Sequence, residues 1–302
     1  MAQETLTKES LRRERFSTST RRLRGFWALY KQSHIGMFGL TLVLAFIAVA
    51  LAAPWVAPYD PRALVGKPFE RPGENHILGT DQVGRDIYSQ LIWGTRISLM
   101  VGLFASAFSV AIGAAIGLVS GYLRGPIDAV MMRITDLFIT LPNIPLMLIL
   151  AAIIGRSVWN IILVIAITGW TGTARMVRAQ TLSIKERPYV EAARSVGARD
   201  SQIMFRHILP NIIPLIFANG IVGIVNAILA ESGLSFLGLG DPTKPSWGLI
   251  LRHANEVGAM ATGRLWFIIP PGICIMLIAI GFAFSSYSLD QILNPRLRER
   301  RG

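Results

Sequence analysis

The chain has 302 residues, of which 52% are hydrophobic and only 16% charged, and its formal net charge is +12. Its apolar residues come in runs too long for the core of a soluble domain, which excludes that class of protein. The basic residues lie between these runs and at the termini without interleaved aromatic side chains, so we expect no nucleic-acid partner. The one cysteine, Cys274, lies in an apolar run and is expected to be a small buried hydrophobic residue.

Six uncharged runs each reach the roughly 17–25 residues that cross a bilayer. They are 36–59, 97–123, 137–155, 157–174, 208–230 and 265–289. We therefore predict an all-α polytopic membrane protein with six transmembrane helices. Only Arg156 separates the third run from the fourth, which predicts a hairpin with a very short outer turn.

The distribution of basic residues predicts the orientation. If the N-terminus is inside, 21 of the 30 Lys and Arg residues fall in the inner segments, as the positive-inside rule favours. We therefore expect both termini to be cytoplasmic. The predicted organisation is a cytoplasmic tail, a first transmembrane helix with an outer loop, a five-helix core with a cytoplasmic loop at about 181–210, and a second cytoplasmic tail. The corresponding ranges are 1–35, 36–95, 96–290 and 291–302.

The outer loop after the first run contains the sequence HILGTDQVGRDIYS, from His76 to Ser89. Two Asp residues among glycines could suggest a calcium loop, but the EF-hand spacing and its closing Glu are absent, so we expect no metal. With the GTRIS sequence that ends at Ser98, this run is similar to the signature of the "C"-type permease subunit of ABC importers for dipeptides, oligopeptides and nickel. The family typically has Arg where this chain has Gln90, which removes the basis for a salt bridge there.

The second run carries a glycine at every fourth residue, at Gly113, Gly117 and Gly121. Small residues at this spacing let two helix backbones approach closely, so we expect this face to pack against another helix. A passage lined by glycine is the alternative.

Two runs contain prolines, in the sequences LPNIP at 141–145 and PPG at 270–272. Proline kinks an apolar helix, and lipid permits the freed carbonyls only where neighbouring helices or a cavity satisfy them. We therefore expect these helices to border a protein-lined space, with Pro142 and Asn143 beside the translocation path.

Two carboxamides of the fifth run, Asn219 and Asn226, are seven residues apart and share one helical face. Facing lipid would be costly for them, so we hypothesise that they face the translocation cavity. Hydrogen bonding between helices is the alternative. Glu231, at the outer end of the same run, is expected to be interfacial and not part of a proton relay.

The polar segment 188–210 separates two apolar runs and must project into water. Pro188 suits the first position of a helix, and Glu191 opposes the positive end of the helix dipole and can pair with Arg194. Tyr189, Ala193 and Val196 share a narrow apolar face.

The same segment contains signals for a second short helix. Gly197 stands where a left-handed C-terminal cap is favoured. Asp200 is expected to cap the start of the second helix, and Pro210 to end it. The segment is therefore predicted to be a helix-turn-helix.

The spacing of Glu191-Ala192-Ala193, Gly197 and the sequence HILP at 207–210 resembles the EAA loop of ABC importer permeases, which docks into the cytoplasmic ATPase subunit. The resemblance implies an ATPase-coupling surface formed by Tyr189, Glu191, Ala192, Ala193, Val196 and Gly197. The sequence ESGLSFLGLG and the following Pro and Trp-Gly, within 231–248, are also similar to the family's outer segment, although composition alone would equally predict a glycine-rich turn.

The resemblance extends from about residue 20 to residue 296. It implies a permease subunit in the inner membrane of a prokaryote, paired with a homologous second permease, one or two ATPase subunits and a solute-binding protein. None of the five lysines precedes Ser or Thr, so the chain has no phosphate-binding loop. We expect no cofactor and no catalysis in this chain, with ATP and Mg²⁺ bound by the partner ATPases.

Peptides are the commonest cargo of the family, and nickel or oligosaccharides are the alternatives. A secondary transporter would require ionisable groups at the bilayer centre or broken helices in matching halves, and no charge lies within a run. An intramembrane protease would require a nucleophile with its base, or paired Asp residues, and neither is visible.

Overall fold

The structure is a computed structural model that describes residues 27–293. Within this range the regular elements are all helices, which confirms the predicted all-α class. They are α2 (His34–Val56), α3 (Ile87–Leu123), α4 (Gly125–Thr140), α5 (Asn143–Ile154), α6 (Val158–Gly169), α7 (Thr171–Lys185), α8 (Pro188–Ser195), α9 (Asp200–Ile203), a π-helical turn (Met204–Ile208), α10 (Leu209–Phe236), α11 (Trp247–Glu256) and α12 (Leu265–Leu293). The predicted tails fall mostly outside the described residues.

Four helices are long and apolar enough to cross a membrane: α2, α3, α12 and the continuous helix Asp200–Phe236. Two further pairs qualify if each counts as one bent span, α4 with α5 and α6 with α7. The chain is therefore a multi-pass protein with four to six candidate spans. The bend between α4 and α5 is 93°, at the Leu141-Pro142 step where a kink was predicted.

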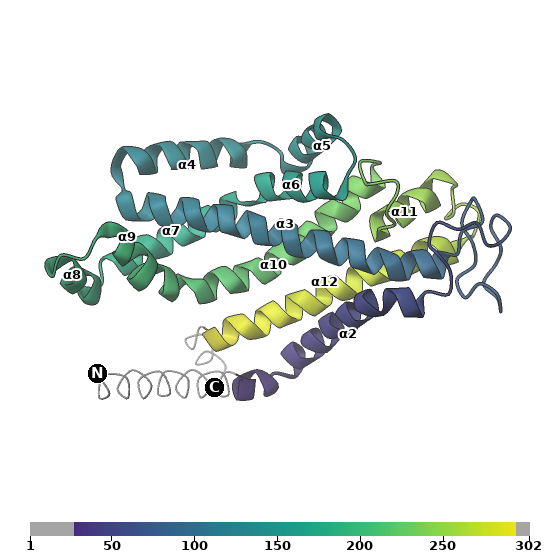
Figure 1. Cartoon of the computed structure of the whole chain (residues 1–302), viewed down its shortest axis with the longest axis horizontal. Coiled ribbons are helices and arrows are strands. Elements are labelled where there is room, and N and C mark those ends of the chain that lie inside the picture. The colour runs from purple at the N-terminus through teal and green to yellow at the C-terminus, as the bar shows by residue number, and fades with distance from the viewer. Residues whose placement is uncertain (1–26, 294–302) are drawn as a thin grey trace, which may run out of the picture.

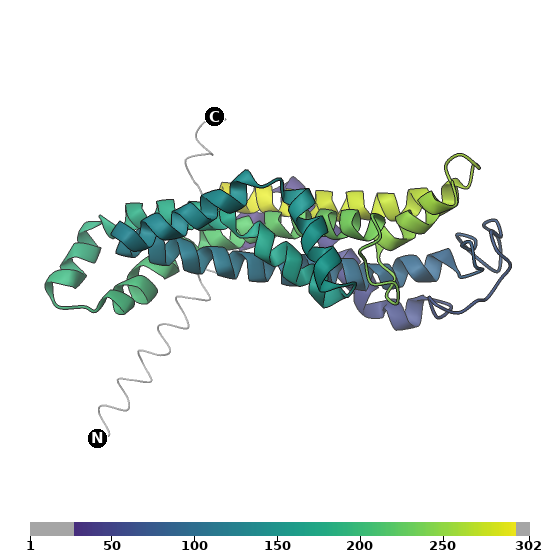
Figure 2. The same cartoon turned by 90° about the horizontal axis from the view of Figure 1, so that it is seen from above.

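The helices form an elongated bundle with distinct ends (Figure 1). The hairpin of α8 and α9 projects at one end, whereas α11 and the loop between α2 and α3 lie at the opposite end (Figures 1 and 2). The segment from 188 to 203 and the loop between α2 and α3 therefore lie at opposite ends of the long axis of the bundle. This arrangement is what opposite sides of a membrane require.

Helix α3 runs through the bundle and packs against α7 along its glycine stripe. A Cβ atom added to any of the three glycines would meet α7 or the residue before it. It would lie 2.5 Å from the Trp170 carbonyl at Gly113, 2.4 Å from the Ala174 carbonyl at Gly117 and 2.8 Å from Thr181 Cβ at Gly121. The stripe therefore packs against a helix, as predicted, and no side chain larger than hydrogen fits there without a shift.

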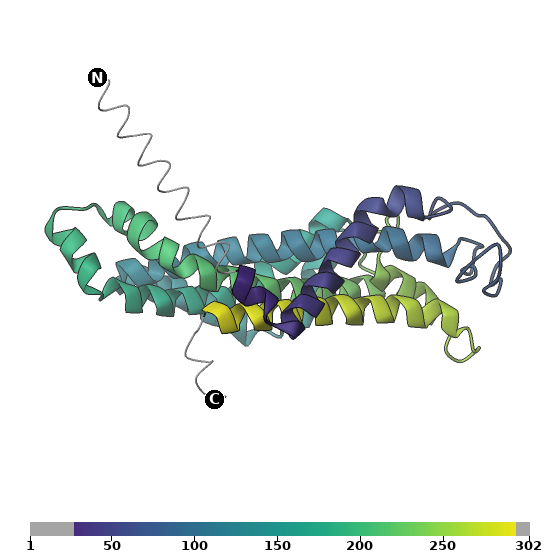
Figure 3. The ribbon, with the colours of Figure 1, turned by 90° about the horizontal axis from the view of Figure 1, so that it is seen from below.

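Helix α2 crosses α12 on the other side of the bundle (Figure 3). Gly39 makes the crossing possible, because a Cβ atom there would lie 2.6 Å from the Gly281 carbonyl oxygen. Helix α12 itself continues through Pro270 and Pro271 as a single helix. Cys274 on α12 is partly buried and packs against the core cluster around Trp247, in agreement with a structural role.

A tight turn joins α5 to α6, as the position of Arg156 predicted. The turn spans 155–157, and Gly155 adopts a positive φ of 99°. Asn160 donates hydrogen bonds to the carbonyls of Ile154 and Gly155, which would otherwise lack partners at the end of α5.

Candidate functional site: the α8 hairpin and the α10 cavity

Helix α8 projects from the bundle, and Val190 is its one buried residue. Pro188 occupies its first turn, as predicted, and Val190 is fully buried against the cluster formed by α3, α7 and α10. Gly197 follows with a φ of +83° and no atom near its missing Cβ, which confirms the predicted left-handed cap. The Tyr189 hydroxyl also accepts a hydrogen bond of 3.3 Å from Asn211 of α10, and most of the remaining surface of the helix is exposed.

The predicted coupling residues lie together on this free surface. Tyr189 is 41% exposed and Val196 is 86% exposed, so both side chains are accessible at the surface of the hairpin. Glu191 and Ala192 are exposed and Ala193 is half-buried. The predicted pairing of Glu191 with Arg194 does not form among the described residues, and Arg194 instead lies beside the Tyr122 hydroxyl.

The C-terminal end of α3 holds both arms of the α8 hairpin. Tyr122 donates a hydrogen bond of 2.5 Å from its hydroxyl to Asp200 Oδ1 at the start of α9. The ammonium group of Lys185, at the end of α7, donates to the Tyr122 carbonyl. Arg124 and Glu186 form an ion pair of 2.6 Å beside it. These residues carry no periodic signal, which is why sequence analysis did not single out Tyr122.

Two expectations for this segment are wrong. Asp200 is the first residue of α9 and not its cap, because its carboxylate is engaged by Tyr122. Pro210 does not end the second helix, since the chain stays helical from Asp200 to Phe236. The π-helical turn at Met204–Ile208 widens the helix just where the Pro210 ring would clash with the carbonyl four residues earlier.

A cavity of about 580 Å³ lies between α3, α5, α6 and α10. It brings together three of the four predicted path residues, Asn143, Asn219 and Asn226, whereas Pro142 is not on its wall. Asn219 also donates a hydrogen bond of 2.9 Å to Thr173 Oγ1. Both interpretations of Asn219 therefore apply, since the side chain lines the cavity and links α10 to α7.

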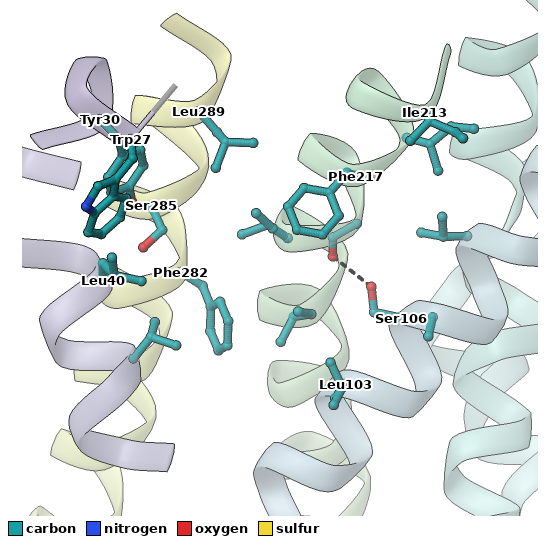
Figure 4. A pocket seen from close by; sticks show the side chains of 17 residues that line it. Trp27, Tyr30, Leu40, Leu103, Ser106, Ile213, Phe217, Phe282, Ser285 and Leu289 are labelled. Carbon is teal, nitrogen blue, oxygen red and sulfur yellow. Dashed lines mark hydrogen bonds between the residues drawn. The ribbon is translucent and has the colours of Figure 1, made fainter. Parts of the chain in front are cut away.

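A second cavity, of about 560 Å³, has a different chemistry. It lies between the α2–α12 pair and the α3–α10 pair, and its wall is almost entirely apolar (Figure 4). Its two serine hydroxyls are turned to backbone carbonyls, Ser106 to Gly220 and Ser285 to Gly281. The hydroxyl protons of these serines are therefore engaged, and neither is free to donate to a hydrophilic solute in this space.

At the opposite end, the HILGTDQVGRDIYS sequence is a self-contained fold of the outer loop. Asp86 caps α3 by accepting from the Ser89 amide at 2.7 Å, and it also contacts His76 Nδ1 at 3.0 Å. Asp81 accepts from Gln90 Nε2 at 3.0 Å. A hydrogen bond from the neutral Gln90 amide to the Asp81 carboxylate therefore occurs at the position where the family typically has Arg.

Glu231 corrects a further expectation. Its side chain is 1% exposed and lies within the protein, not at an interface with water. Its carboxylate accepts hydrogen bonds from Ser235 at 2.7 Å and from Ser98 of α3 at 3.2 Å. Nearby on α11, burial lowers the pKa of His253 although the Asp81 carboxylate acts in the opposite direction, which favours a neutral imidazole.

Comparison with known proteins agrees with this architecture. Residues 113–299 match the family described as binding-protein-dependent transport system inner membrane component, and residues 22–71 match the N-terminal TM domain of oligopeptide transport permease C. The glutathione transport system permease protein GsiD of Pectobacterium atrosepticum is 36% identical over 278 residues, which are 91% of each chain. The dipeptide transport system permease protein DppC of Haemophilus influenzae is 34% identical over 285 residues, 92% of this chain and 96% of that one.

Among solved structures, the inward-facing MetNI methionine ABC transporter shares the fold. The TM-score is 0.53 at 19% identity, over 68% of this chain and 95% of the MetNI chain. The fold and the matches define a membrane-embedded transport subunit. The chain belongs to the family of binding-protein-dependent transport system inner membrane components, and it is a permease subunit of an ABC importer whose ATPase is a separate subunit.

Proposed function

We propose that this chain forms half of the translocation pathway of an importer for peptides that a solute-binding protein delivers. It would work with a homologous second permease and one or two ATPase subunits that bind ATP and Mg²⁺. The names of the relatives support the substrate class, since glutathione and dipeptides are both peptides. Nickel and oligosaccharides remain the alternative cargo.

The proposed topology has six spans, with α4–α5 and α6–α7 each counted as one, and both termini and α8 in the cytoplasm of a prokaryotic inner membrane. The excess of basic residues on that side supports it. The proposed segments are the two tails, the first helix with its outer loop, and the five-helix core carrying the α8 hairpin.

The exposed α8 helix is the observation that carries the proposed coupling. Large apolar side chains such as Tyr189 and Val196 are costly to leave in water, and they become favourable when a partner covers them. The small Ala192 and Ala193 allow that partner to approach closely. We infer that the ATPase covers this face, because the hairpin projects at the end of the bundle with the basic excess.

The cavity on α10 is the proposed substrate path. Peptides carry amide and charged groups, and carboxamides such as Asn219 and Asn226 can both donate to and accept from them. The apolar cavity of Figure 4 has no carboxamide or charged side chain on its walls, and its two serine hydroxyls donate to backbone carbonyls.

The test of this function uses the complex that co-purifies with the tagged chain from native membranes. Mass spectrometry of the ligand retained by its binding protein identifies the cargo, and vesicle uptake of a labelled dipeptide, glutathione, Ni²⁺ and an oligosaccharide ranks the candidates. We expect peptide uptake that requires ATP. Uptake of Ni²⁺ or the oligosaccharide alone would contradict the substrate class.

A pair of variants on α10 tests the path. Asn226→Phe fills the carboxamide cavity and should block uptake, whereas Ile213→Phe adds bulk in the apolar cavity and should leave uptake close to that of the wild type. Equal uptake in both variants, with equal complex yield, would reject the proposed path.

A further inference from the structure

Glu231 is buried within the protein, unlike a charged side chain at a membrane interface, which would reach water. It lies near the outer end of α10, and no Lys, Arg or His of the described residues pairs with it within 4.0 Å. A buried ionisable group without a pairing cation is costly, so its retention needs a compensating role. The hydrogen bonds to its carboxylate come from serine hydroxyls, those of Ser98 on α3 and of Ser232 and Ser235 on α10 itself.

One of these partners, Ser98 of α3, connects Glu231 on α10 to the start of α11. The Ser98 hydroxyl of α3 donates to Glu231 Oε2 at 3.2 Å, and the same hydroxyl oxygen accepts from the Trp247 amide, in the first turn of α11, at 3.4 Å. Ser246 caps α11 by accepting from the Leu249 amide at 3.3 Å. The Ser98 hydroxyl is therefore the link between the Glu231 carboxylate and the first turn of α11.

Helices α10 and α11 are closely packed next to the Glu231 carboxylate. A Cβ atom at Gly248 would lie 2.5 Å from the Ser232 carbonyl, so α11 and α10 touch backbone to backbone. Trp247 is fully buried and donates from its indole nitrogen to the Leu91 carbonyl of α3 at 3.2 Å. Helix α11 is therefore joined rigidly to α3 and α10 at its first residues.

Helix α11 is a short element at the outer end of the bundle. Its 10 residues are about half the length that crosses a bilayer, and the loop that follows it exposes Met260. On α10, the neighbours Ala230 and Gly233 line the carboxamide cavity, whereas the Glu231 carboxylate contacts Ser98 of α3. A displacement of α11 would therefore turn or shift the helix that forms the cavity wall.

We propose that Glu231 is a positioning residue that ties the outer helix α11 to the cavity-lining helix α10 through Ser98, so that docking of the solute-binding protein at the outer end is transmitted to the substrate path. This inference rests on the proposed function. The proposed function is thereby extended by one buried carboxylate, that of Glu231. Its removal should uncouple α11 from α10 and leave both the carboxamide cavity and the α8 surface intact.

The experiment compares basal ATP hydrolysis with hydrolysis stimulated by the co-purified, ligand-loaded binding protein, in the reconstituted complex. Glu231→Ala removes the carboxylate, and Glu231→Gln keeps its shape without the charge. The matched control is Glu256→Gln, at the exposed end of α11, where the carboxylate forms a surface ion pair with Arg252. We expect stimulation and uptake to fall about tenfold in Glu231→Ala and less in Glu231→Gln, as loss of charge-assisted hydrogen bonds predicts, while basal hydrolysis and the control stay near wild type.

Three results would overturn the proposal. These are wild-type stimulation in both Glu231 variants, basal and stimulated hydrolysis falling in equal proportion, and loss of assembly in Glu231→Ala with an unaffected Glu231→Gln. Failure of the proposed function is distinguishable, because the wild-type complex would then show no stimulation by the binding protein at all.

Discussion

Each end of the bundle carries a short helix, α8 at one end and α11 at the other, and the two helices differ in how much of their surface is buried. Helix α8 buries one residue, Val190, half-buries Ala193 and exposes the rest, whereas α11 buries Trp247, Gly248, Leu249 and Ile250 together. The polar contacts of the α8 hairpin lie where it joins the bundle, between Tyr122 and Asp200 and between Asn211 and Tyr189. Those of α11 are at its own first turn. This difference fits our proposal that a partner covers α8, whereas α11 moves with the bundle.

The largest expected difference between the ends is their side of the membrane. Ser195, the last residue of α8, and Thr243, before α11, are both exposed, and single cysteines at these positions can be compared in a Cys274→Ser background. A membrane-impermeant thiol reagent applied to intact cells should label the Thr243 variant and not the Ser195 variant. Equal labelling at both sites, with equal labelling after lysis, would contradict the opposed ends.

The next largest effect is expected from bulk on the α8 surface. Ala193→Trp places a large ring where the partner must approach, and we expect the ATPase subunits to dissociate or uptake to fall by about tenfold or more, as for a truncated or blocked interface anchor. The counterpart at the other end is Met260→Trp, on an exposed loop. That variant should retain the ATPase. Pull-down from detergent measures retention in both, and retention in Ala193→Trp with normal uptake would remove α8 from the interface.

A smaller effect on uptake is expected from the Tyr122–Asp200 hydrogen bond, where the α8 hairpin joins the bundle. Tyr122→Phe removes the hydrogen bond to Asp200, and because a bond to a charged group contributes about 1.5–3 kcal/mol but Asp200 is open to solvent, we expect only about a threefold loss of uptake. The ratio of uptake to ATP hydrolysis is the readout. Tyr287→Phe, which removes an exposed hydroxyl from α12, is the control. An unchanged ratio would show that α3 does not orient the hairpin.

The smallest functional effect is expected in the outer loop. Gln90→Leu leaves the buried Asp81 carboxylate with one partner fewer, and the cost of an unsatisfied buried group is about 1–3 kcal/mol. The thermal midpoint of the purified complex should therefore fall, while uptake per folded complex stays unchanged. Gln32→Leu, at an exposed position, controls for the change in polarity. An unchanged midpoint would show that Gln90 contributes nothing to the loop.

Local patterns predicted much of this fold. Hydrophobic runs located the helices, the glycine stripe located the α3–α7 contact, and Pro188 with Gly197 set the limits of α8. Hydropathy could not reveal that α3 begins at Ile87 and that the helix of α10 begins at Asp200, because the added turns are polar and are supported by tertiary contacts.

The contacts that connect the sites join residues far apart in the chain, which explains why they were missed. Ser98 and Glu231 are 133 residues apart, and Tyr122 and Asp200 are 78 apart. Asp200 has the composition of a helix cap, and Glu231 the position of an interfacial charge. In each case a partner from α3 decided the environment of the carboxylate, and no local pattern encodes such a partner.

The central claim is that α8 docks the ATPase and that the cap at Gly197 sets its angle. The structure offers a matched pair, because Gly197 and Gly258 both have positive φ, of 83° and 60°, and both have open space around the missing Cβ. Valine at either position meets the same left-handed penalty of about 1–2 kcal/mol. Pull-down of the ATPase should therefore fail or weaken in Gly197→Val and remain at the wild-type level in Gly258→Val. Wild-type retention in both variants, or equal loss in both, would contradict the account.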